Sequence, residues 1–333
     1  MLASQVFDNH GRPINYVRLA VTDRCNLRCF YCMPEHGINF LPRKELLSYE
    51  EMIRILKILA SLGVNKVRIT GGEPFAKRDL IKFLAQVCET DGIDKIRITT
   101  NGVLTAPYIA DLKALGITNI NLSLDTLNRD RFKSMTRRDE FHKVWETFEL
   151  MLQQDFSVKM NCVVIEDKNT QDIIPMAKLT GQYPVDIRFI EEMPFNGNGN
   201  TRAKLNWDYA KIRDVLQAQY PNLHPVESGP HSTSMNYEIP GHLGTIGIIA
   251  AYSRTFCGSC NRIRITSQGA LNTCLYGGSV MNIKDQLRSG ASDEMVRDTF
   301  LKVFRQRAKD GFEAEQARAD GSPATESMST IGG

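Results

Sequence analysis

The sequence predicts an α/β fold: a partial (β/α)6 barrel of the TIM type, with a smaller C-terminal α+β part closing its open side. Between residues 15 and 190, six runs of strand-forming residues alternate with helical segments, which is typical of βαβ units and a parallel sheet. Six such units fall short of the eight of a closed barrel. The alternation stops after the sixth run. An open, doubly wound sheet is the alternative.

The predicted strands are rich in Val, Ile, Leu and Tyr, and cover residues 15–21, 64–70, 93–100, 119–125, 158–165 and 185–190. Helices are predicted at 48–62, 79–89, 106–115 and 172–180, with helical stretches before residue 154. Ser48 and Glu51 have the spacing of a capping box, and Gly63 and Gly116 are typical helix stops. These signals predict where each βαβ unit begins and ends.

The region after residue 220 is predicted to be organised differently. Pro, Gly, Ser and His interrupt residues 221–240. We expect a helix at 207–219, short strands at 245–250 and 262–266, and helices at 283–288 and 293–307. The predicted divisions are a barrel at 1–220, a second region at 221–315, and a flexible tail at 316–333 that ends in Gly332 and Gly333.

The strand at 119–125 has one polar face. Asn119, Asn121, Ser123 and Asp125 alternate with Ile120, Leu122 and Leu124, and a period of two places the two sets on opposite faces. A filled barrel has apolar residues inside, so a polar inner face predicts a polar ligand in the lumen. An edge strand that faces water is the alternative.

Composition narrows the class of protein. The chain has 333 residues, 42% of them hydrophobic, and a net charge of +3, which is too small to indicate a nucleic-acid polymer as a partner. No apolar run is long enough to span a membrane, and residues 1–10 lack the pattern of a secretory signal. Eight cysteines without such a signal favour thiols in a reducing, cytoplasmic environment.

Cys25, Cys29 and Cys32 follow the first predicted strand with the spacing C-x3-C-x2-C. Thiolates this close in sequence can hold one metal centre. Three ligands on a four-iron cube leave one iron open for a substrate or cofactor. Zinc usually takes four ligands, and no fourth Cys or His follows closely. An iron–sulfur cluster with an open iron is therefore the favoured interpretation.

Cys257, Cys260 and Cys274 form a second set of three thiols, spaced C-x2-C-x13-C around a predicted strand. A second cluster with an open iron is the sharper interpretation, and a zinc site stays the alternative because of the C-x2-C pair. The two remaining cysteines, Cys88 and Cys162, are expected to be core residues.

Cations occupy several predicted strands. Arg262 and Arg264 share a face with Thr266, Arg68 shares one with Thr70, and Lys159 shares one with Asn161. Arg18 lies in the first strand. Together these five cations would surround the lumen and bind a polyanion such as a nucleoside triphosphate, because guanidinium groups match phosphate oxygens. Each alone is the kind of charge that usually faces solvent.

Gly71-Gly72-Glu73-Pro74 follows the second strand. Glycines permit a close approach of the backbone, and an exposed carboxylate or carbonyl there could bind an ammonium group.

These motifs resemble the radical S-adenosylmethionine (SAM) superfamily, and within it the GTP 3′,8-cyclase family of molybdenum cofactor biosynthesis. The resemblance rests on VRLAVTDRCNLRCFYCMP, VRITGGEP, ITTNG, NLSLDTL, IEEMPFNGN and FCGSCNRIRIT with the later Cys274. It extends over nearly the whole chain and includes a terminal Gly-Gly.

The resemblance implies a role for each matching residue. Cys25, Cys29 and Cys32 would hold the [4Fe–4S] cluster that binds SAM, and Cys257, Cys260 and Cys274 a second [4Fe–4S] cluster. SAM contacts would come from Tyr31, Gly72, Ser123 and Met193, and GTP contacts from Arg18, Arg68, Thr99, Lys159, Arg262, Ile263 and Arg264. Arg262, Arg264, Gly332 and Gly333 would support catalysis.

The implied activity is that of a carbon–carbon lyase, which converts GTP to (8S)-3′,8-cyclo-7,8-dihydroguanosine 5′-triphosphate. The implied partners are an external reductant and a cyclic pyranopterin monophosphate synthase that takes the product, and the chain could form a homodimer. Two alternatives remain open at this point. One is a radical SAM enzyme that matures a peptide, and the other is a zinc- and nucleotide-binding protein without enzymatic activity.

Overall fold

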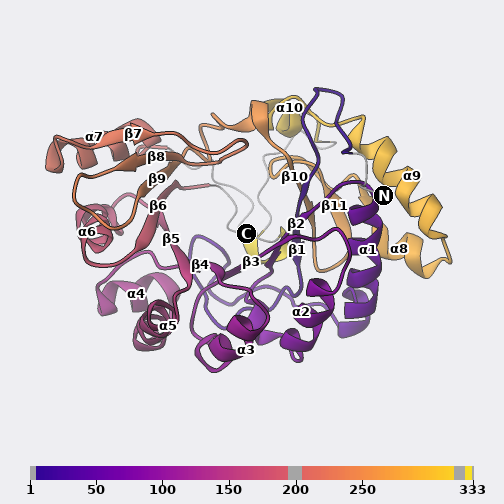
Figure 1. Ribbon diagram of the computed structural model, residues 1–333, viewed down its shortest axis with the longest axis horizontal. Coiled ribbons are helices and arrows are strands. Elements are labelled where there is room, and N and C mark those ends of the chain that lie inside the picture. The colour runs from indigo at the N-terminus through magenta and orange to yellow at the C-terminus, as the bar shows by residue number, and fades with distance from the viewer. Residues whose placement is uncertain (1–4, 194–204, 319–326, 332–333) are drawn as a thin grey trace.

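A computed structural model describes residues 5–193, 205–318 and 327–331 of the chain. Twelve strands form one sheet in the order β12-β11-β10-β1-β2-β3-β4-β5-β6-β9-β8-β7 (Figure 1). All neighbours from β10 through β1 to β6 and on to β9 pair in parallel. The predicted α/β fold with a parallel sheet is confirmed.

The barrel part alternates strands and helices as predicted. Its strands are β1 (Tyr16–Ala20), β2 (Lys66–Thr70), β3 (Lys95–Thr100), β4 (Asn119–Ser123), β5 (Ser157–Val164) and β6 (Val185–Glu191). Its helices are α1 (Tyr49–Ser61), α2 (Leu80–Cys88), α3 (Ile109–Ala114), α4 (Arg129–Thr136), α5 (Phe141–Gln153) and α6 (Ile173–Gln182).

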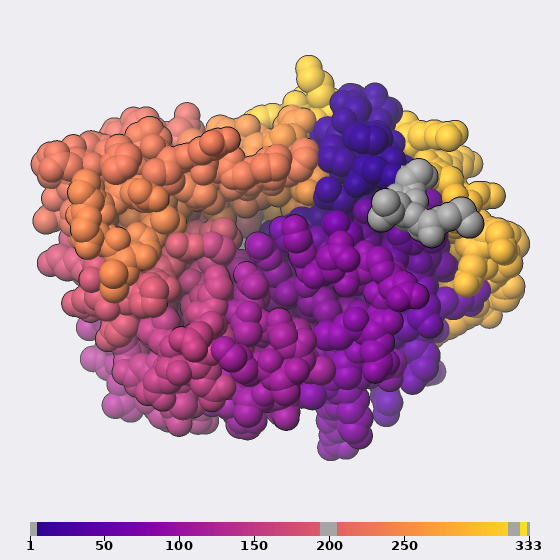
Figure 2. Space-filling model, in the orientation of Figure 1, coloured from indigo at the N-terminus to yellow at the C-terminus, as the bar shows by residue number. Residues whose placement is uncertain are grey.

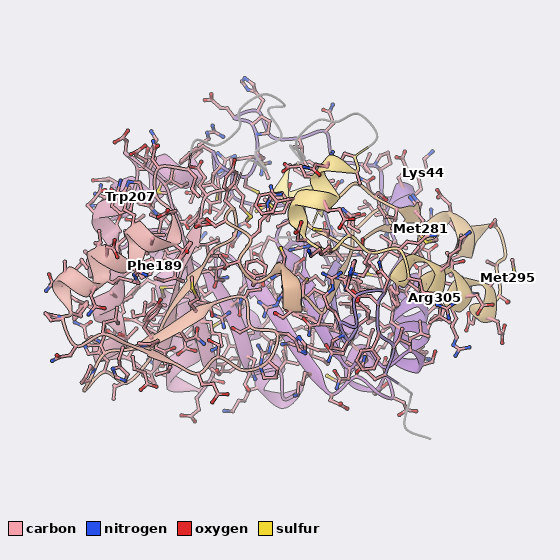
Figure 3. All side chains as sticks on the ribbon, turned by 90° about the horizontal axis from the view of Figure 1, so that it is seen from above. Lys44, Phe189, Trp207, Met281, Met295 and Arg305 are labelled. Atoms are coloured by element: carbon pink, nitrogen blue, oxygen red, sulfur yellow. The ribbon has the colours of Figure 1, made fainter. Side chains whose placement is uncertain are left out.

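The C-terminal part adds strands to both edges of the sheet. β9 (Ile246–Ile249) pairs with β6 and continues through β8 (Met235–Glu238) to β7 (His224–Val226). β10 (Arg262–Ile265) pairs with β1 and continues through β11 (Ala270–Asn272) to β12 (Met281–Asn282). Seen from above, Trp207 and Phe189 accordingly lie toward one end of the molecule, and Met281 and Met295 toward the other (Figure 3).

The strands β7, β8, β11 and β12 were not predicted. Each has only two to four residues, and such short runs show no clear period. The remaining helices are α7 (Tyr209–Gln219), α8 (Ile283–Arg288), α9 (Asp293–Phe304), α10 (Gly311–Gln316) and α11 (Met328–Ile331). The last of these lies within the predicted tail, whose flexibility stays a prediction. Among the described residues, none of the helices combines the length and hydrophobicity that crossing a bilayer requires.

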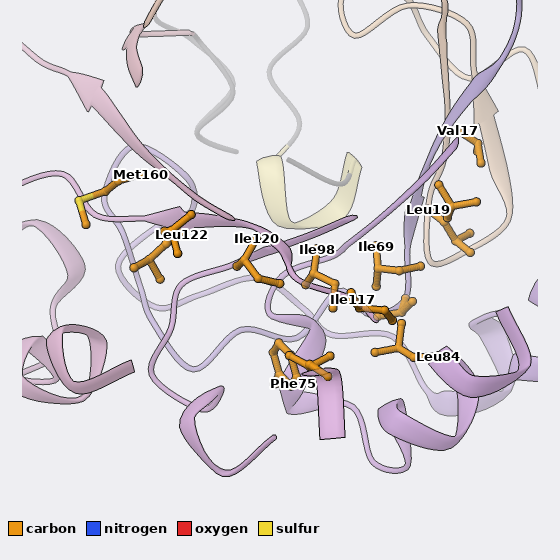
Figure 4. Close-up of a cluster of buried hydrophobic side chains, with 14 of the residues drawn as sticks. Val17, Leu19, Ile69, Phe75, Leu84, Ile98, Ile117, Ile120, Leu122 and Met160 are labelled. Atoms are coloured by element: carbon orange, nitrogen blue, oxygen red, sulfur yellow. The ribbon is translucent and has the colours of Figure 1, made fainter. Parts of the chain in front are cut away.

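The core lies between the outer face of the sheet and the helices. Val17, Leu19, Ile69, Ile98 and Ile120 point from successive strands toward the helical layer, where Phe75 and Leu84 meet them (Figure 4). On β4 the apolar residues of the alternating pattern are buried in this core. The polar residues Asn121, Ser123 and Asp125 face a cavity on the inner side of the sheet. The predicted polar lumen is therefore present.

The predicted capping box begins α1. Ser48 Oγ accepts a hydrogen bond from the Glu51 backbone N–H (3.2 Å), and the Glu51 carboxylate accepts one from the Ser48 N–H (2.7 Å). We expect Ser48→Ala to lower the free energy of unfolding by about 1 kcal/mol, and Ser48→Gly by only a few tenths of that. Urea denaturation of the two variants measures this, and an equal loss in both would contradict the capping role.

Candidate active site

One cavity of about 580 Å³ opens on the inner side of the sheet. It gathers sixteen of the predicted site residues: Arg18, Cys25, Cys29, Tyr31, Cys32, Arg68, Gly72, Thr99, Ser123, Lys159, Met193, Cys257, Cys260, Arg262, Arg264 and Cys274. Ile263 is not part of its lining, because the side chain lies on the opposite face of β10 and is fully buried in the core. Gly332 and Gly333 lie outside the described residues. The two cysteine sets, far apart in sequence, thus line a single cavity.

The first cysteine set lies in the loop after β1, and the loop after β2 supports it. The Gly72 N–H donates to Thr22 O (2.8 Å), and the Glu73 N–H donates to Arg24 O (2.8 Å). Asn101, after β3, donates from Nδ2 toward Cys25 Sγ (3.6 Å). The carboxyl ends of three neighbouring parallel strands therefore hold this thiol loop together.

Gly72 is required by this close approach. A Cβ built at Gly72 would lie 2.3 Å from Arg24 O and 2.8 Å from Asp23 O, which are backbone atoms that cannot rotate away. Gly71 has φ +153°, and a Cβ there would lie 2.5 Å from Thr22 O. Only side-chain-free residues let these two loops pack against each other.

Glu73 has a different role from the one expected. Its side chain is fully buried, and its carboxylate accepts hydrogen bonds from the Phe75 N–H (3.1 Å), the Asn101 N–H (2.8 Å) and Thr100 Oγ1 (2.8 Å). Burial raises the pKa of Glu73 to about 7 despite these bonds. The prediction that an exposed carboxylate here binds an ammonium group is wrong for this side chain, which instead connects the loops after β2 and β3.

Tyr31, between the second and third cysteine, is fixed by Asp125. Its hydroxyl donates to Asp125 Oδ2 (2.6 Å), and Asp125 Oδ1 accepts from the Val163 N–H (2.8 Å). Burial raises the pKa of Asp125 to about 6. Asp125 belongs to the polar face of 119–125 but was not predicted as a site residue. Its place in the alternating pattern was the available signal.

The last described residues of the chain lie against the first cysteine set. Ser327 Oγ donates to Cys32 O (2.7 Å), and the hydroxyls of Ser327 and Ser329 are 2.7 Å apart. Met328 and Ser329 line the cavity. A segment that follows the whole barrel in sequence thus forms part of the cavity wall.

The second cysteine set comes from two elements. Cys257 and Cys260 lie in and just after a 3-10 turn, Cys257–Ser259, and Cys274 follows β11. All three thiols are unbridged. Burial raises the pKa of Cys257 and Cys274. Burial also acts to raise the pKa of Cys260, but Arg262 and Arg307 outweigh it and lower that pKa to about 7.

The two cysteines outside these sets differ from each other. Cys162 is fully buried, as expected. Cys88 is exposed. The neighbouring Val87 is on the buried face of α2, so Cys88 falls on the outer face of that helix. The expectation that Cys88 is a core residue is wrong.

Each thiol set offers three ligands to a cluster. The three thiols of each set are unbridged and line the shared cavity. A four-iron cube takes one thiolate at each iron, so three thiolates would leave one iron open to the cavity.

Arginines cross the inner face of the sheet in a row. The strand register places Arg264 of β10 beside Arg18 of β1, Arg18 beside Arg68 of β2, and Arg68 beside Arg97 of β3. Within the part of the chain that the structure describes, Arg18 Nε is buried without a hydrogen-bond partner. Burial lowers the pKa of Arg18 to about 10; Tyr16 acts against this lowering, and Arg68 and Arg262 add to it. A row of like charges along a cavity favours an anionic ligand.

Further polar residues of the cavity were missed. Lys66, Arg97 and Arg188 line it together with the five predicted cations. Lys66 lies two residues before the predicted Arg68, and Arg97 lies two before the predicted Thr99. Arg188 pairs with Asn161, which shares a strand face with the predicted Lys159. The period of two could have identified them. Only Asp125 and Glu192 contribute carboxylates to the described lining.

Tyr16 lies among these cations. Its hydroxyl accepts a hydrogen bond from Arg68 Nε (2.5 Å), and Lys66 Nζ lies 4.4 Å from the ring centroid. Burial acts to raise the pKa of Tyr16, but the positive charges of Arg68, Arg18 and Lys66 lower it to about 7. Burial lowers the pKa of Lys66 to about 8. The charge of the cavity therefore changes close to neutral pH.

Comparison with known families defines the class of protein first. Residues 19–180 match the family model described as Radical SAM superfamily, and residues 185–312 match the one described as Molybdenum Cofactor Synthesis C. SuiB of Streptococcus suis has a similar fold, with a TM-score of 0.61 at 15% identity over 92% of this chain and 68% of that one. The matched family model and the fold thus place the chain among radical SAM proteins.

Sequence relatives then define the particular family. The chain is 39% identical over 302 residues to the GTP 3′,8-cyclase of Heliobacterium modesticaldum, covering 90% of this chain and 92% of that one. It is 41% identical over 288 residues to molybdenum cofactor biosynthesis protein 1 of Bos taurus, covering 86% of this chain and 45% of that protein. The chain belongs to the GTP 3′,8-cyclase family. It spans about half the length of the animal relatives that it matches.

Proposed function

We propose that the chain is a radical SAM GTP 3′,8-cyclase, which converts GTP to (8S)-3′,8-cyclo-7,8-dihydroguanosine 5′-triphosphate in the first step of molybdenum cofactor biosynthesis. The observation that carries this proposal is the shared cavity. Two sets of three thiols line it from different ends of the chain, and eight Arg and Lys side chains line it along with only two carboxylates among the described residues. A triphosphate between two clusters accounts for both features.

The residues of the first loop would hold SAM beside the first cluster. Cys25, Cys29 and Cys32 would bind that [4Fe–4S] cluster, and Tyr31, Gly72, Ser123 and Met193 would contact SAM. When bound, the reduced cluster and SAM supply the one-electron chemistry that removes a hydrogen atom from the substrate. Asp125 holds Tyr31 in place through the 2.6 Å hydrogen bond. The close packing of Gly71 and Gly72 against residues 22–24 fixes the loop.

The opposite side of the cavity would hold GTP. Cys257, Cys260 and Cys274 would bind the second [4Fe–4S] cluster next to the guanine, and Arg18, Arg68, Thr99, Lys159, Arg262, Ile263 and Arg264 would contact the nucleotide. Ile263 could contribute only through its backbone, because its side chain lies in the core. Joining C3′ of the ribose to C8 of the base requires one fixed conformer. Cations bound to the triphosphate and a cluster beside the guanine would select that conformer of GTP.

Several parts of this proposal rest on the family alone. The catalytic role of Gly332 and Gly333 is one. Delivery of the product to a cyclic pyranopterin monophosphate synthase, an external reductant, a cytoplasmic location and a possible homodimer are others.

The direct test is turnover under anaerobic conditions. The reconstituted chain is incubated with GTP, SAM and a reductant, and the nucleotide is analysed by mass spectrometry and NMR. We expect 5′-deoxyadenosine together with a cyclised nucleotide. Formation of 5′-deoxyadenosine only when a peptide is added would instead identify a peptide-maturing enzyme. Zinc in place of iron in both sites would identify a metal- and nucleotide-binding protein.

Nucleotide affinity should depend on pH. The pKa of Tyr16 is lowered to about 7 and that of Lys66 to about 8. Raising the pH from 7 to 9 therefore completes the ionisation of Tyr16, which is about half ionised at pH 7, and removes most of the positive charge of Lys66. We expect the Kd for GTP to rise by about tenfold or more over this range, because binding of a polyanion takes up protons. Isothermal titration calorimetry in buffers of different ionisation enthalpy measures both the Kd for GTP and the number of protons taken up on binding. Affinity that is constant or improves toward pH 9 would contradict this charge arrangement.

A further inference from the structure

An N-terminal loop, residues 5–14, lies against the C-terminal segments that carry the second cysteine set. In the space-filling view this indigo segment lies between orange and yellow C-terminal residues (Figure 2). A bridge between Phe7 and Pro13 and a hydrogen bond from the Asp8 N–H to Arg12 O (3.0 Å) close the loop. The loop encloses the carboxylate of Asp8, whose side chain has no exposed surface.

Asp8 connects two buried guanidinium groups. Its Oδ2 accepts from Arg12 Nε (2.7 Å) and from Arg307 Nη1 (3.0 Å), and its Oδ1 accepts from the backbone N–H groups of His10 and Arg12 (both 2.9 Å). The side chains of Arg12 and Arg307 are only 6% and 3% exposed. These bonds and charges outweigh burial and lower the pKa of Asp8. The three residues form one charged unit inside the protein.

This unit binds the backbone of the second cysteine set. Arg12 Nη1 donates to Cys257 O (3.2 Å), and Arg307 Nη1 donates to Cys260 O (3.2 Å). Arg307 Nη2 donates to O of Thr273, the residue before Cys274 (3.2 Å). For each of the three cysteines, a guanidinium group therefore donates a hydrogen bond either to the carbonyl of the cysteine itself or to the carbonyl of the residue before it.

Arg307 also approaches a sulfur directly. Its Nη2 lies 3.8 Å from Cys260 Sγ, which is within hydrogen-bonding distance for sulfur. Hydrogen bonds to the sulfurs are among the factors that set the reduction potential of an iron–sulfur cluster. The groups around a metal site that hold its ligands also affect how tightly it binds.

We propose that Asp8, Arg12 and Arg307 are positioning residues that hold Cys257, Cys260 and Cys274 in place for the second cluster, and that Arg307 raises the reduction potential of that cluster through Cys260. The inference rests on the proposed function for the identity of the cluster. It assigns a role to a loop that does not line the cavity. It also explains why two arginines and an aspartate are buried far from solvent, where charges are costly unless all of them are paired.

Labelling of individual cysteines tests the positioning role. The anaerobically reconstituted chain is exposed to iodoacetamide, and the labelled peptides are quantified by mass spectrometry. Asp8→Asn leaves the guanidinium groups of Arg12 and Arg307 buried without their carboxylate. Arg307→Met removes the donor to Cys260 O and Thr273 O. We expect labelling of the second set to rise at least about tenfold in both variants, while Cys25, Cys29 and Cys32 stay protected.

The chain contains its own controls. Exposed Cys88 reports that the reagent works, and buried Cys162 reports that the barrel is folded. Arg129→Met removes one partner of an exposed pair with Asp139, formed through two hydrogen bonds of 2.9 and 3.0 Å, and should change no labelling. Unchanged labelling of the second set in Asp8→Asn and Arg307→Met would overturn the proposal. The proposal would also be overturned if labelling of Cys162 rose together with labelling of the second set, because the network would then support only the fold as a whole.

The potential of the cluster tests the contact with sulfur. Arg307→Lys keeps a positive charge beside Asp8, but its single nitrogen cannot replace both Nη1, which bonds to Asp8, and Nη2, which approaches Cys260 Sγ. We expect all six cysteines to stay protected and the cluster whose EPR signal does not respond to SAM to titrate at a more negative potential. An unchanged potential would overturn this part. Labelling and potentials require no turnover of GTP, so failure of the proposed cyclase activity would be recognised separately.

Discussion

Replacing Gly72 by alanine is expected to reduce turnover by about 10²-fold or more, because a displacement of about 1 Å at a reacting group can cost that much. The added Cβ would overlap the backbone at Arg24 O, 2.3 Å away, and at Asp23 O, 2.8 Å away. The residues directly before Cys25 would have to shift, and the first thiol would shift with them. Steady-state kinetics measure the loss of turnover, and the EPR spectrum of the SAM-bound protein reports the shift of the first thiol.

Two further glycines serve as controls for this result. A Cβ at Gly278 would meet nothing within 4 Å, so Gly278→Ala should leave both activity and stability unchanged. A Cβ at Gly244 would lie 2.0 Å from Val185 O, so Gly244→Ala should lower stability without altering the spectrum of the first cluster. If Gly72→Ala retains full turnover and an unaltered spectrum, the close packing of the two loops does not position the cysteines.

Arg18→Met is expected to weaken GTP binding by about 10- to 100-fold, since a hydrogen bond to a charged group contributes about 1.5–3 kcal/mol. The same change should leave the unfolding free energy unchanged or raise it. The strand register places Arg18 beside Arg68 and Arg264. Its Nε is buried, and Arg68 and Arg262 act on it as like charges. Without a polyanion, removing this charge relieves repulsion. Calorimetric titration of GTP and urea denaturation of the apo protein measure the two effects.

Arg288→Met should show the opposite behaviour. Arg288 bonds to Glu51 (2.6 Å) and to the carbonyls of Lys44 and Leu46 on the outer surface. Its removal should lower stability modestly and leave the Kd for GTP unchanged. Loss of stability in Arg18→Met with an unaltered Kd would show that the arginine row supports the fold and does not bind substrate.

Much of the fold could be predicted because its signals are local. The strict alternation at 119–125 predicted both a buried face and a polar face of that strand. The spacing of Ser48 and Glu51 predicted the start of a helix. The edges of the sheet were harder to predict. β10 pairs with β1 although some 240 residues separate them, and nothing in a short window indicates a pairing over that distance.

The site shows the same division. The two cysteine sets could be recognised from spacing alone, and the alternating pattern brought most of the cations to one face. Glu73 was misassigned because a motif does not reveal whether a carboxylate is already used by the neighbouring loop. The network of Asp8, Arg12 and Arg307 was missed because Arg307 lies some 300 residues from the other two. Each of the three also looks like an ordinary surface charge in sequence.

The central claim is that SAM on the first thiol set and GTP on the arginine row share one cavity. GTP labelled with deuterium at C3′ tests this most directly, with the 5′-deoxyadenosine analysed by mass spectrometry after a single turnover. We predict that the deuterium appears in 5′-deoxyadenosine. Deuterium that remains entirely in the nucleotide while 5′-deoxyadenosine accumulates would contradict a shared cavity.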